Sequence, residues 1–216
     1  LLVCRWNKKM IEVMVLALYG DKAASTRYRL LQYKSFLEDS GIELEVFSLL
    51  SNEYLVKKFN GKRVSLFNLL ISVFNRIKIL LKQKKYDCAI VHCEIFPLLP
   101  GWIESRILKI PYIYDFDDAF YIKYKSKRFQ FVSPFLGNKF MPIIKRAYCV
   151  TAGNNILKNY ASNINENTFM LPTVVDTCLL YTSDAADDSL RVDLGCRPII
   201  KKVVLVSVFC CVSTVR

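Results

Sequence analysis

The residues best suited to chemistry are three aspartates within four positions, Asp115, Asp117 and Asp118, which follow an apolar segment. Carboxylates this close repel one another, so at least one pKa rises and proton transfer or metal binding is favoured. The same residues could also serve only as turn and capping groups. We interpret them as candidate catalytic residues.

An Asp-x-Asp pair allows two metal-dependent alternatives, a sugar transferase of a different fold and an aspartate-nucleophile phosphatase. The phosphatase motif should follow the first strand and carry Thr or Val in the place of Ala119, and the sequence meets neither condition. A His-rich metal site is disfavoured because His92 is the only histidine, and no Cys-x-x-Cys pair is present. We expect no bound metal, while a metal-dependent transferase or phosphatase stays open as an alternative.

Polar side chains that follow other apolar segments are candidates for substrate binding: Ser25, Arg27, Arg29, His92, Glu94 and Asn154. Arg27 and Arg29 stand in the first turn of a predicted helix, where an anion bound at the helix start would favour them. The preceding turn has one glycine, Gly20, whereas a dinucleotide fingerprint needs three. No nicotinamide, flavin or other cofactor is therefore expected.

The elements that must position these residues alternate along the chain. Apolar runs predict strands at residues 11–18, 44–49, 88–92, 111–115, 149–151 and 168–171. Helical spacing predicts helices from an N-cap at Ser25 to a stop at Gly41, and at residues 65–84, 98–108, 140–146 and 155–161. This alternation predicts an α/β fold, with a Rossmann-like parallel sheet covered by helices on both faces.

The predicted helix at residues 65–84 is amphipathic. Its apolar side holds Leu66, Leu69, Leu70, Val73, Phe74, Ile77 and Leu81. Its basic residues, Arg76, Lys78 and Lys82, lie on or near the other side.

One edge of the predicted sheet should gather the candidate residues, because ligands of open parallel sheets bind beyond the carboxyl ends of the strands. We therefore predict a single rim centred on Arg27, Arg29, Glu94 and the segment Asp115–Asp118.

The chain is strongly basic, with 31 Lys and Arg against 19 Asp and Glu and a formal net charge of +12. Its apolar stretches are too short to span a bilayer. The segment Tyr121–Phe131 interleaves basic and aromatic residues, a pattern that suits nucleic acid or anionic lipid headgroups. A basic membrane- or nucleic-acid-binding module is therefore a second alternative function.

Both ends of the chain are interpreted as non-native. We expect residues 1–9 to be a translated leader and residues 10–177 to form the native domain. Cys178–Asp187 resembles a translated transposase sequencing adapter, and the match continues to Lys202, so residues 178–216 are expected to be a tail that does not join the core. Five of the 31 basic and four of the 19 acidic residues lie in this tail, so the rest keeps a net charge of +11.

The order of motifs across residues 10–177 resembles the N-terminal, acceptor-side domain of a family 4 glycosyltransferase with the two-domain GT-B fold. The resemblance rests on Ala24–Arg29 after the first strand, Leu37–Glu43 before the second, Tyr86-Asp87 before the third, Pro111–Ala119, and Leu171–Thr177 at the junction to a second domain. A catalytic histidine that the family often places after the fourth strand is replaced here by Asp115–Asp118.

The resemblance implies transfer of a sugar from a nucleotide-sugar donor to a cell-envelope or lipid-linked glycan acceptor, with retention of configuration and without a metal. It implies that the rim binds the acceptor and that a second domain, absent here, holds most of the donor. The fragment alone is then expected to be inactive. The implied location is the cytoplasm, including attachment of the basic domain to the anionic inner face of the plasma membrane, and no nucleic-acid partner is expected.

Overall fold

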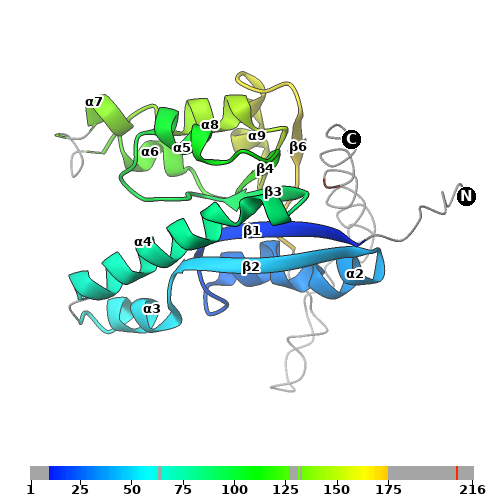
Figure 1. Cartoon of the computed structure of the whole chain (residues 1–216). Coiled ribbons are helices and arrows are strands. Elements are labelled where there is room, and N and C mark those ends of the chain that lie inside the picture. The colour runs from blue at the N-terminus through cyan, green and yellow to red at the C-terminus, as the bar shows by residue number, and fades with distance from the viewer. Residues whose placement is uncertain (1–9, 63–64, 127–130, 132, 175–207, 209–216) are drawn as a thin grey trace, which may run out of the picture.

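A parallel sheet organises the computed structural model, which describes residues 10–62, 65–126, 131, 133–174 and 208. Within these residues six strands pair in the order β2-β1-β3-β4-β5-β6, all parallel (Figure 1). The strands are β1 (Ile11–Tyr19), β2 (Ile42–Leu50), β3 (Cys88–His92), β4 (Tyr112–Phe116), β5 (Cys149–Ala152) and β6 (Thr168–Met170).

The strand order reverses at β1, which pairs with β2 on one side and with β3 on the other. A sheet that is wound in both directions from its centre has its topological switch point there, between β1 and β3. Helices connect successive strands and cover both faces, so the predicted α/β Rossmann-like fold is confirmed.

The helices of the described residues lie between these strands. The longer ones are α3 (Asn52–Phe59), α4 (Leu66–Leu81), α5 (Gly101–Ile107), α8 (Phe140–Arg146) and α9 (Asn155–Ser162). Shorter ones are α1 (Ala24–Arg29), α2 (Lys34–Asp39), α6 (Phe120–Lys123), α7 (Ser133–Leu136) and the 3-10 turns η1 (Leu31–Tyr33) and η2 (Gln83–Lys85).

Alternate residues of each strand enter two separate hydrophobic layers, as the period of a β-strand requires. Met14 and Leu16 of β1 face the layer that is closed by α5, α8, α9 and the end of α4. Val13 and Val15 face the opposite layer, which is closed by the segment from α1 to α2 and by Val208. The strands in the middle of the sheet are therefore buried on both faces, which is why their sequences are continuously apolar.

Most predicted elements are confirmed to within a few residues, but α3, α6 and α7 were not predicted, and the segment from α1 to α2 differs from the prediction. Ser25 lies inside α1, whose N-cap is Ala23 without a side-chain cap, so the predicted cap is wrong. The predicted single helix before Gly41 divides into α1, η1 and α2. The helix α3 was not predicted, although Ser51 gives it a capping signal because its Oγ accepts a hydrogen bond from Tyr54 N at 3.3 Å.

The expectation for the tail can be examined only at Val208, because residues 175–207 and 209–216 lie outside the described residues, as does the proposed leader. Val208 is fully buried in the layer with Val13 and Val15. The expectation that the tail stays apart from the core is therefore wrong at this residue. Apolar side chains cover an open apolar face whatever the origin of their segment, so this contact does not bear on the adapter resemblance.

Among the described helices, none combines the length and the hydropathy that crossing a bilayer demands.

Candidate functional site

Asp115 lies at the centre of a buried polar network at the carboxyl edge of the sheet. Its Oδ2 accepts a hydrogen bond from Arg29 Nε at 2.9 Å and lies 2.8 Å from His92 Nδ1. Its Oδ1 bonds Arg29 Nη2 and accepts the Thr151 hydroxyl at 2.6 Å. Both carboxylate oxygens are thus fully engaged, and the side chain is only 4% exposed.

Arg29 joins three distant segments of the chain through this network. Besides its two-point contact with Asp115, its Nη1 donates to Leu171 O at 2.7 Å and to Thr173 Oγ1 at 3.2 Å. The guanidinium is buried, so it is not presented to a phosphate group in this conformation. Its geometry is that of a residue that fixes the rim, tying α1 to β4 and to the segment after β6.

The electrostatics of this pair predict a pH-dependent stability. Burial alone would raise the pKa of Asp115, but Arg29 and His92 hold that pKa well below its usual range. A depressed folded-state pKa stabilises the protein above the unfolded value of about 3.9, and this stabilisation is lost as the pH falls further. We expect the carboxyl-carbon NMR signal of Asp115 to keep its ionised position down to about pH 3, whereas the same carboxyl in urea titrates near pH 4.

The signal is assigned by its disappearance in Asp115→Asn. Titration of the folded carboxyl near pH 4 would show that the Arg29 contact is not maintained in solution.

Asp117 and His92 carry polar atoms that are buried without a hydrogen-bond partner among the described residues, Asp117 Oδ1 and His92 Nε2. Burial raises the pKa of Asp117, and Asp115 and Asp118 add to the rise, while His92 and Arg29 oppose it. Asp117 is half-buried and so remains reachable from solvent. Among the three aspartates it is therefore the one best placed to accept a proton.

Cys93 follows β3 with a left-handed backbone, φ 68°, which is unusual for a residue with a side chain. Its thiol and the ligand atoms of His92 and Asp117 all lie within 4.8 Å of one another. Because His92 Nδ1 contacts Asp115, Nε2 is the nitrogen left for a ligand, and such carboxylate–histidine contacts orient metal ligands. This nitrogen, sulfur and oxygen set could hold a divalent cation such as zinc.

This group differs from the metal alternative drawn from the sequence, which used the aspartates alone. Asp115 already bonds Arg29 and Thr151, so it is not free to bind a metal. The ligands beside Asp117 would instead be His92 and Cys93. Without a cation the Cys93 thiol is not reactive, because burial, together with Asp117, Asp115 and Glu94, raises its pKa well above the usual range.

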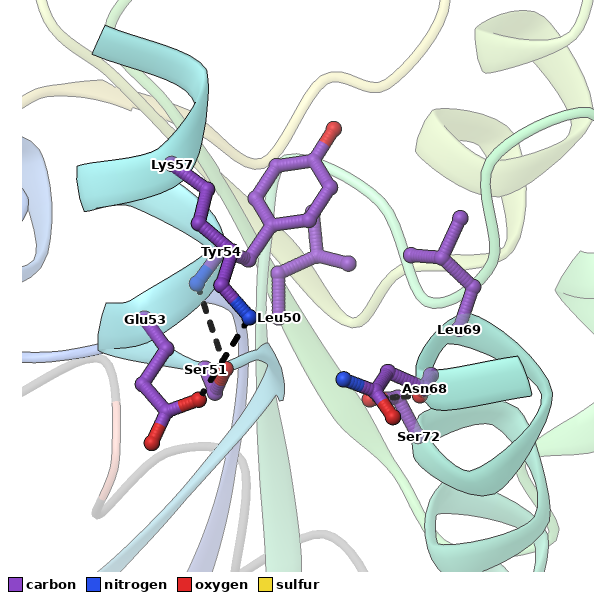
Figure 2. A pocket seen from close by; sticks show the side chains of 8 residues that line it. All are labelled: Leu50, Ser51, Glu53, Tyr54, Lys57, Asn68, Leu69 and Ser72. Atoms are coloured by element: carbon purple, nitrogen blue, oxygen red, sulfur yellow. Dashed lines mark hydrogen bonds and ion pairs between the residues drawn. The ribbon is translucent and has the colours of Figure 1, made fainter. Parts of the chain in front are cut away.

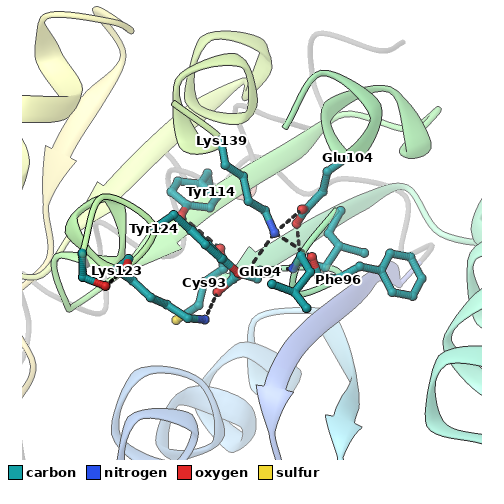
Figure 3. Close-up of polar contacts among 11 residues, drawn as sticks. Cys93, Glu94, Phe96, Glu104, Tyr114, Lys123, Tyr124 and Lys139 are labelled. Carbon is teal, nitrogen blue, oxygen red and sulfur yellow. Dashed lines mark hydrogen bonds and ion pairs between the residues drawn. The ribbon is translucent and has the colours of Figure 1, made fainter. Parts of the chain in front are cut away.

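Glu94 forms a second buried network beside the first (Figure 3). Its two oxygens contact Lys123 Nζ at 2.8 Å and Lys139 Nζ at 2.8 Å, and Tyr124 donates its hydroxyl at 2.6 Å. Lys139 also lies 2.8 Å from Glu104, an ion pair without hydrogen-bond geometry, and donates to Phe96 O at 2.6 Å.

The charges in this network shift the two glutamates in opposite directions. Burial would raise the pKa of Glu94, but Lys139 and Lys123 lower it overall. Burial outweighs Lys139 at Glu104, whose pKa is raised. Glu94 is completely buried, so in this conformation it does not face a substrate. Its contacts with Lys123, Tyr124 and Lys139 stabilise the rim from within the protein.

The remaining predicted residues lie on the open side of the rim. Arg27 and Asp118 are exposed, and Ser25 is half-buried. Arg27 Nη1 donates to the carbonyls of Asp21 and Lys22, at 3.2 and 3.0 Å, which shapes the loop after β1. Arg27 and Asp118 thus share the carboxyl edge of the sheet, in agreement with the predicted rim geometry.

Asn154 is exposed at the same edge and has a structural task that its sequence position did not reveal. It is the N-cap of α9, where its Oδ1 accepts a hydrogen bond from Leu157 N at 2.9 Å.

Two of the aromatic rings in the basic segment that starts at Tyr121 are directed inward, whereas Ile122 and Phe131 are exposed. Tyr121 stacks on Tyr160 with ring centroids 4.0 Å apart, and Tyr124 is fully buried. Lys123 contacts Glu94. These two rings are therefore not available for stacking on a base, while residues 127–130 lie outside the described range.

Sequence reasoning missed several residues that build the site, chiefly Lys139, Glu104 and Gly153. A Cβ on Gly153 would come within 2.9 Å of Asp117 Cα, so a glycine is needed for the two segments to pack. The glycine that follows β5 was the available signal for this close approach. Nothing in the sequence linked Lys139 to Glu94, which is 45 positions away.

Compared with the models of known protein families and with curated proteins, the chain matches neither a family nor a protein. The functional argument therefore depends on the fold and on the geometry of this rim.

Proposed function

We propose that this chain is the acceptor-binding half of a glycosyltransferase that transfers a sugar from a nucleotide-sugar to a cell-envelope or lipid-linked glycan. The observation that supports the proposal most is the placement of Asp117. It is a half-buried carboxylate with a raised pKa at the carboxyl edge of a doubly wound sheet, next to His92 Nε2, which has no hydrogen-bond partner in the described part of the chain. Such edges are where ligands of open parallel sheets bind.

Each rim residue has a role in this proposal. Asp117 accepts the proton of the attacking acceptor hydroxyl, and Asp118 accepts hydrogen bonds from the acceptor sugar. Arg27, which is an exposed cation at the rim, binds a phosphate of a lipid-linked acceptor. Arg29, Asp115 and Glu94 hold the loops that carry these groups. We place the enzyme in the cytoplasm, where it works on acceptors at the inner face of the membrane.

The donor would bind mainly to a second domain, in keeping with the resemblance to family 4 enzymes. Holding both substrates in one cleft accounts for about 7–11 kcal/mol of a bimolecular barrier. A protein limited to residues 10–177 should therefore show no measurable transfer from any nucleotide-sugar.

The test of this proposal uses a full-length relative with the same rim residues. Asp117→Asn should lower kcat by about 10²–10⁴-fold, the usual contribution of a general base. Asp118→Ala should also lower turnover, and Arg27→Ala should chiefly raise KM for a phosphate-linked acceptor. The control is Asp39→Asn, because Asp39 is an exposed carboxylate at the end of α2, on the opposite edge of the sheet. Unchanged kinetics in all three rim variants would refute the proposed site.

A second candidate function is a metal-dependent transferase or phosphatase, favoured by the grouping of His92, Cys93 and Asp117. It predicts that the purified chain retains about one equivalent of zinc after gel filtration and that Cys93→Ser loses it. Transfer that is unaffected by a chelator, together with a metal-free protein, would exclude this candidate.

A further inference from the structure

The long helix α4 turns its apolar side toward solvent, contrary to the usual behaviour of an amphipathic helix. Leu66, Phe74 and Leu81 are 76%, 58% and 78% exposed. Other large apolar side chains of the same helix are also exposed: Phe67, Leu70, Ile71, Val73 and Ile77. Eight large apolar side chains are therefore exposed along one helix, and a contiguous apolar surface of this kind marks an interaction site.

The orientation of α4 about its own axis is fixed by contacts on the side opposite the apolar stripe. Arg76 is buried, and its Nη2 donates to Ala17 O, at the end of β1, at 2.6 Å. Burial lowers the pKa of Arg76 to about 10, although Glu104 opposes that shift. Leu80 is buried in the main core, and Leu69 packs against Leu18 and neighbouring residues. The apolar stripe therefore cannot turn inward without removing a buried arginine from its carbonyl partner.

The charge around this stripe is positive except at Glu53 of α3, whose Oε2 lies 4.0 Å from Lys57 Nζ. Between Glu53 and Asp87 the sequence contains no acidic residue, while its basic residues are Lys57, Lys58, Lys62, Arg63, Arg76, Lys78, Lys82, Lys84 and Lys85. Lys78 lies at the margin of the stripe, with its Nζ 4.5 Å from the centre of the Phe74 ring. Lysines that flank an apolar stripe are typical of helices that lie in a membrane interface.

The adjacent helix α3 extends the same surface. In Figure 1, α3 and the start of α4 project together from the sheet, and Phe59 at the end of α3 is 87% exposed. Where the two helices meet, a small pocket is lined by Ser51, Tyr54, Asn68 and Ser72 among others, with Glu53 and Lys57 on its α3 side (Figure 2).

We propose that the α3–α4 surface, residues 52–62 and 65–85, docks onto an anionic lipid bilayer, with the apolar stripe of α4 in the headgroup region. An anionic bilayer offers both an apolar layer and negative charge, which this surface matches. A second copy of the chain is a poorer occupant, because two such surfaces, each strongly basic with Glu53 as the one acidic residue of its described positions, repel each other.

Docking in this way would place the rim at the membrane surface. The helix α3 starts directly after the carboxyl end of β2, and the parallel strands put that end on the same edge as the rim. The proposed function assumes contact with a membrane, and this inference names the surface that makes it; its evidence comes from α3, α4 and the lysines after α4 and does not require sugar transfer.

The test measures sedimentation of the full chain with vesicles of phosphatidylcholine, either alone or mixed with roughly one-third phosphatidylglycerol. The wild type should bind the mixed vesicles in a salt-sensitive manner. The triple variant Leu66→Gln, Leu70→Gln, Phe74→Gln should bind at least about tenfold more weakly. The matched control replaces three exposed apolar residues elsewhere, Trp102→Gln, Ile122→Gln and Ile156→Gln, and should bind like the wild type.

A second set of variants tests the charge. Lys58→Gln, Lys78→Gln and Lys82→Gln should each weaken binding to the mixed vesicles by about fivefold. The controls Lys109→Gln and Lys145→Gln, whose side chains are exposed outside α3 and α4, should not weaken it. The proposal is overturned if the wild type stays in the supernatant, or if the triple variant binds as well as its control. It is also overturned if light scattering shows a dimer that the triple variant dissociates while vesicles recruit neither protein. Because no sugar is involved, these outcomes are independent of any failure to detect transfer.

Discussion

Replacing Lys139 with methionine should lower the free energy of unfolding by about 3–5 kcal/mol, because it removes the cation between two buried carboxylates. Lys139 Nζ lies 2.8 Å from both Glu94 and Glu104, and its side chain is completely buried. In a domain of this size the loss corresponds to a fall in Tm of roughly 6–20 °C. Lys145→Met is the control, because Lys145 is exposed on α8, the helix that begins directly after Lys139, and it should change stability by less than about 0.5 kcal/mol.

The pH dependence of the Lys139→Met protein separates a charge effect from a loss of packing. Without its cation, a buried glutamate has a pKa above its unfolded value, so the folded state binds more protons than the unfolded state. Stability then falls as the pH rises above the unfolded glutamate pKa of about 4.3, and the variant should recover part of its stability between pH 7 and pH 5.

Adding Glu104→Gln to Lys139→Met should recover stability at pH 7, because it removes one of the two carboxylates while keeping an oxygen that can accept the Ile95 N–H. A deficit that does not change with pH, and that Glu104→Gln does not reduce, would show that packing and not charge accounts for the loss.

The parts of the fold that follow local rules could be predicted from the sequence. Continuous apolar runs identified the middle strands because these are buried on both faces, and the alternation of strands with helices identified the parallel topology. Parallel topology in turn placed Arg27 and Asp117 on one edge, although about ninety positions separate them.

Burial of charge was the part that could not be predicted. Arg29, Glu94 and Asp115 carry charges and follow strands, so we expected them to face a ligand. Each is instead buried against an opposite charge that comes from a distant segment, and neither spacing nor residue type encodes such a meeting.

The direction in which the apolar side of α4 faces could not be predicted either. The apolar stripe was identified correctly, but its direction depends on Arg76, which bonds a carbonyl of β1 and so directs the stripe outward. A periodic pattern defines a helix face and leaves open whether the protein or something outside it covers that face.

Arg29→Met should lower the free energy of unfolding by about 3–5 kcal/mol, an effect as large as that of Lys139→Met, and should also loosen the rim. Asp115 would keep His92 and Thr151 but lose its only permanent cation, while the carbonyl of Leu171 would lose its guanidinium partner. Arg29→Lys keeps the charge but lacks the planar guanidinium that bonds both oxygens of Asp115, so it should restore only part of the stability.

Arg27→Met is the matched control, since Arg27 belongs to the same helix and is exposed, and it should change stability by less than about 0.5 kcal/mol. The readout beyond stability is amide hydrogen exchange. Because Arg29 joins α1 to β4 and to the segment after β6, its loss should speed exchange in β4, β6 and α1 together, with little change at β2. Faster exchange confined to α1 would mean that Arg29 stabilises its own helix and does not hold the strands of the rim together.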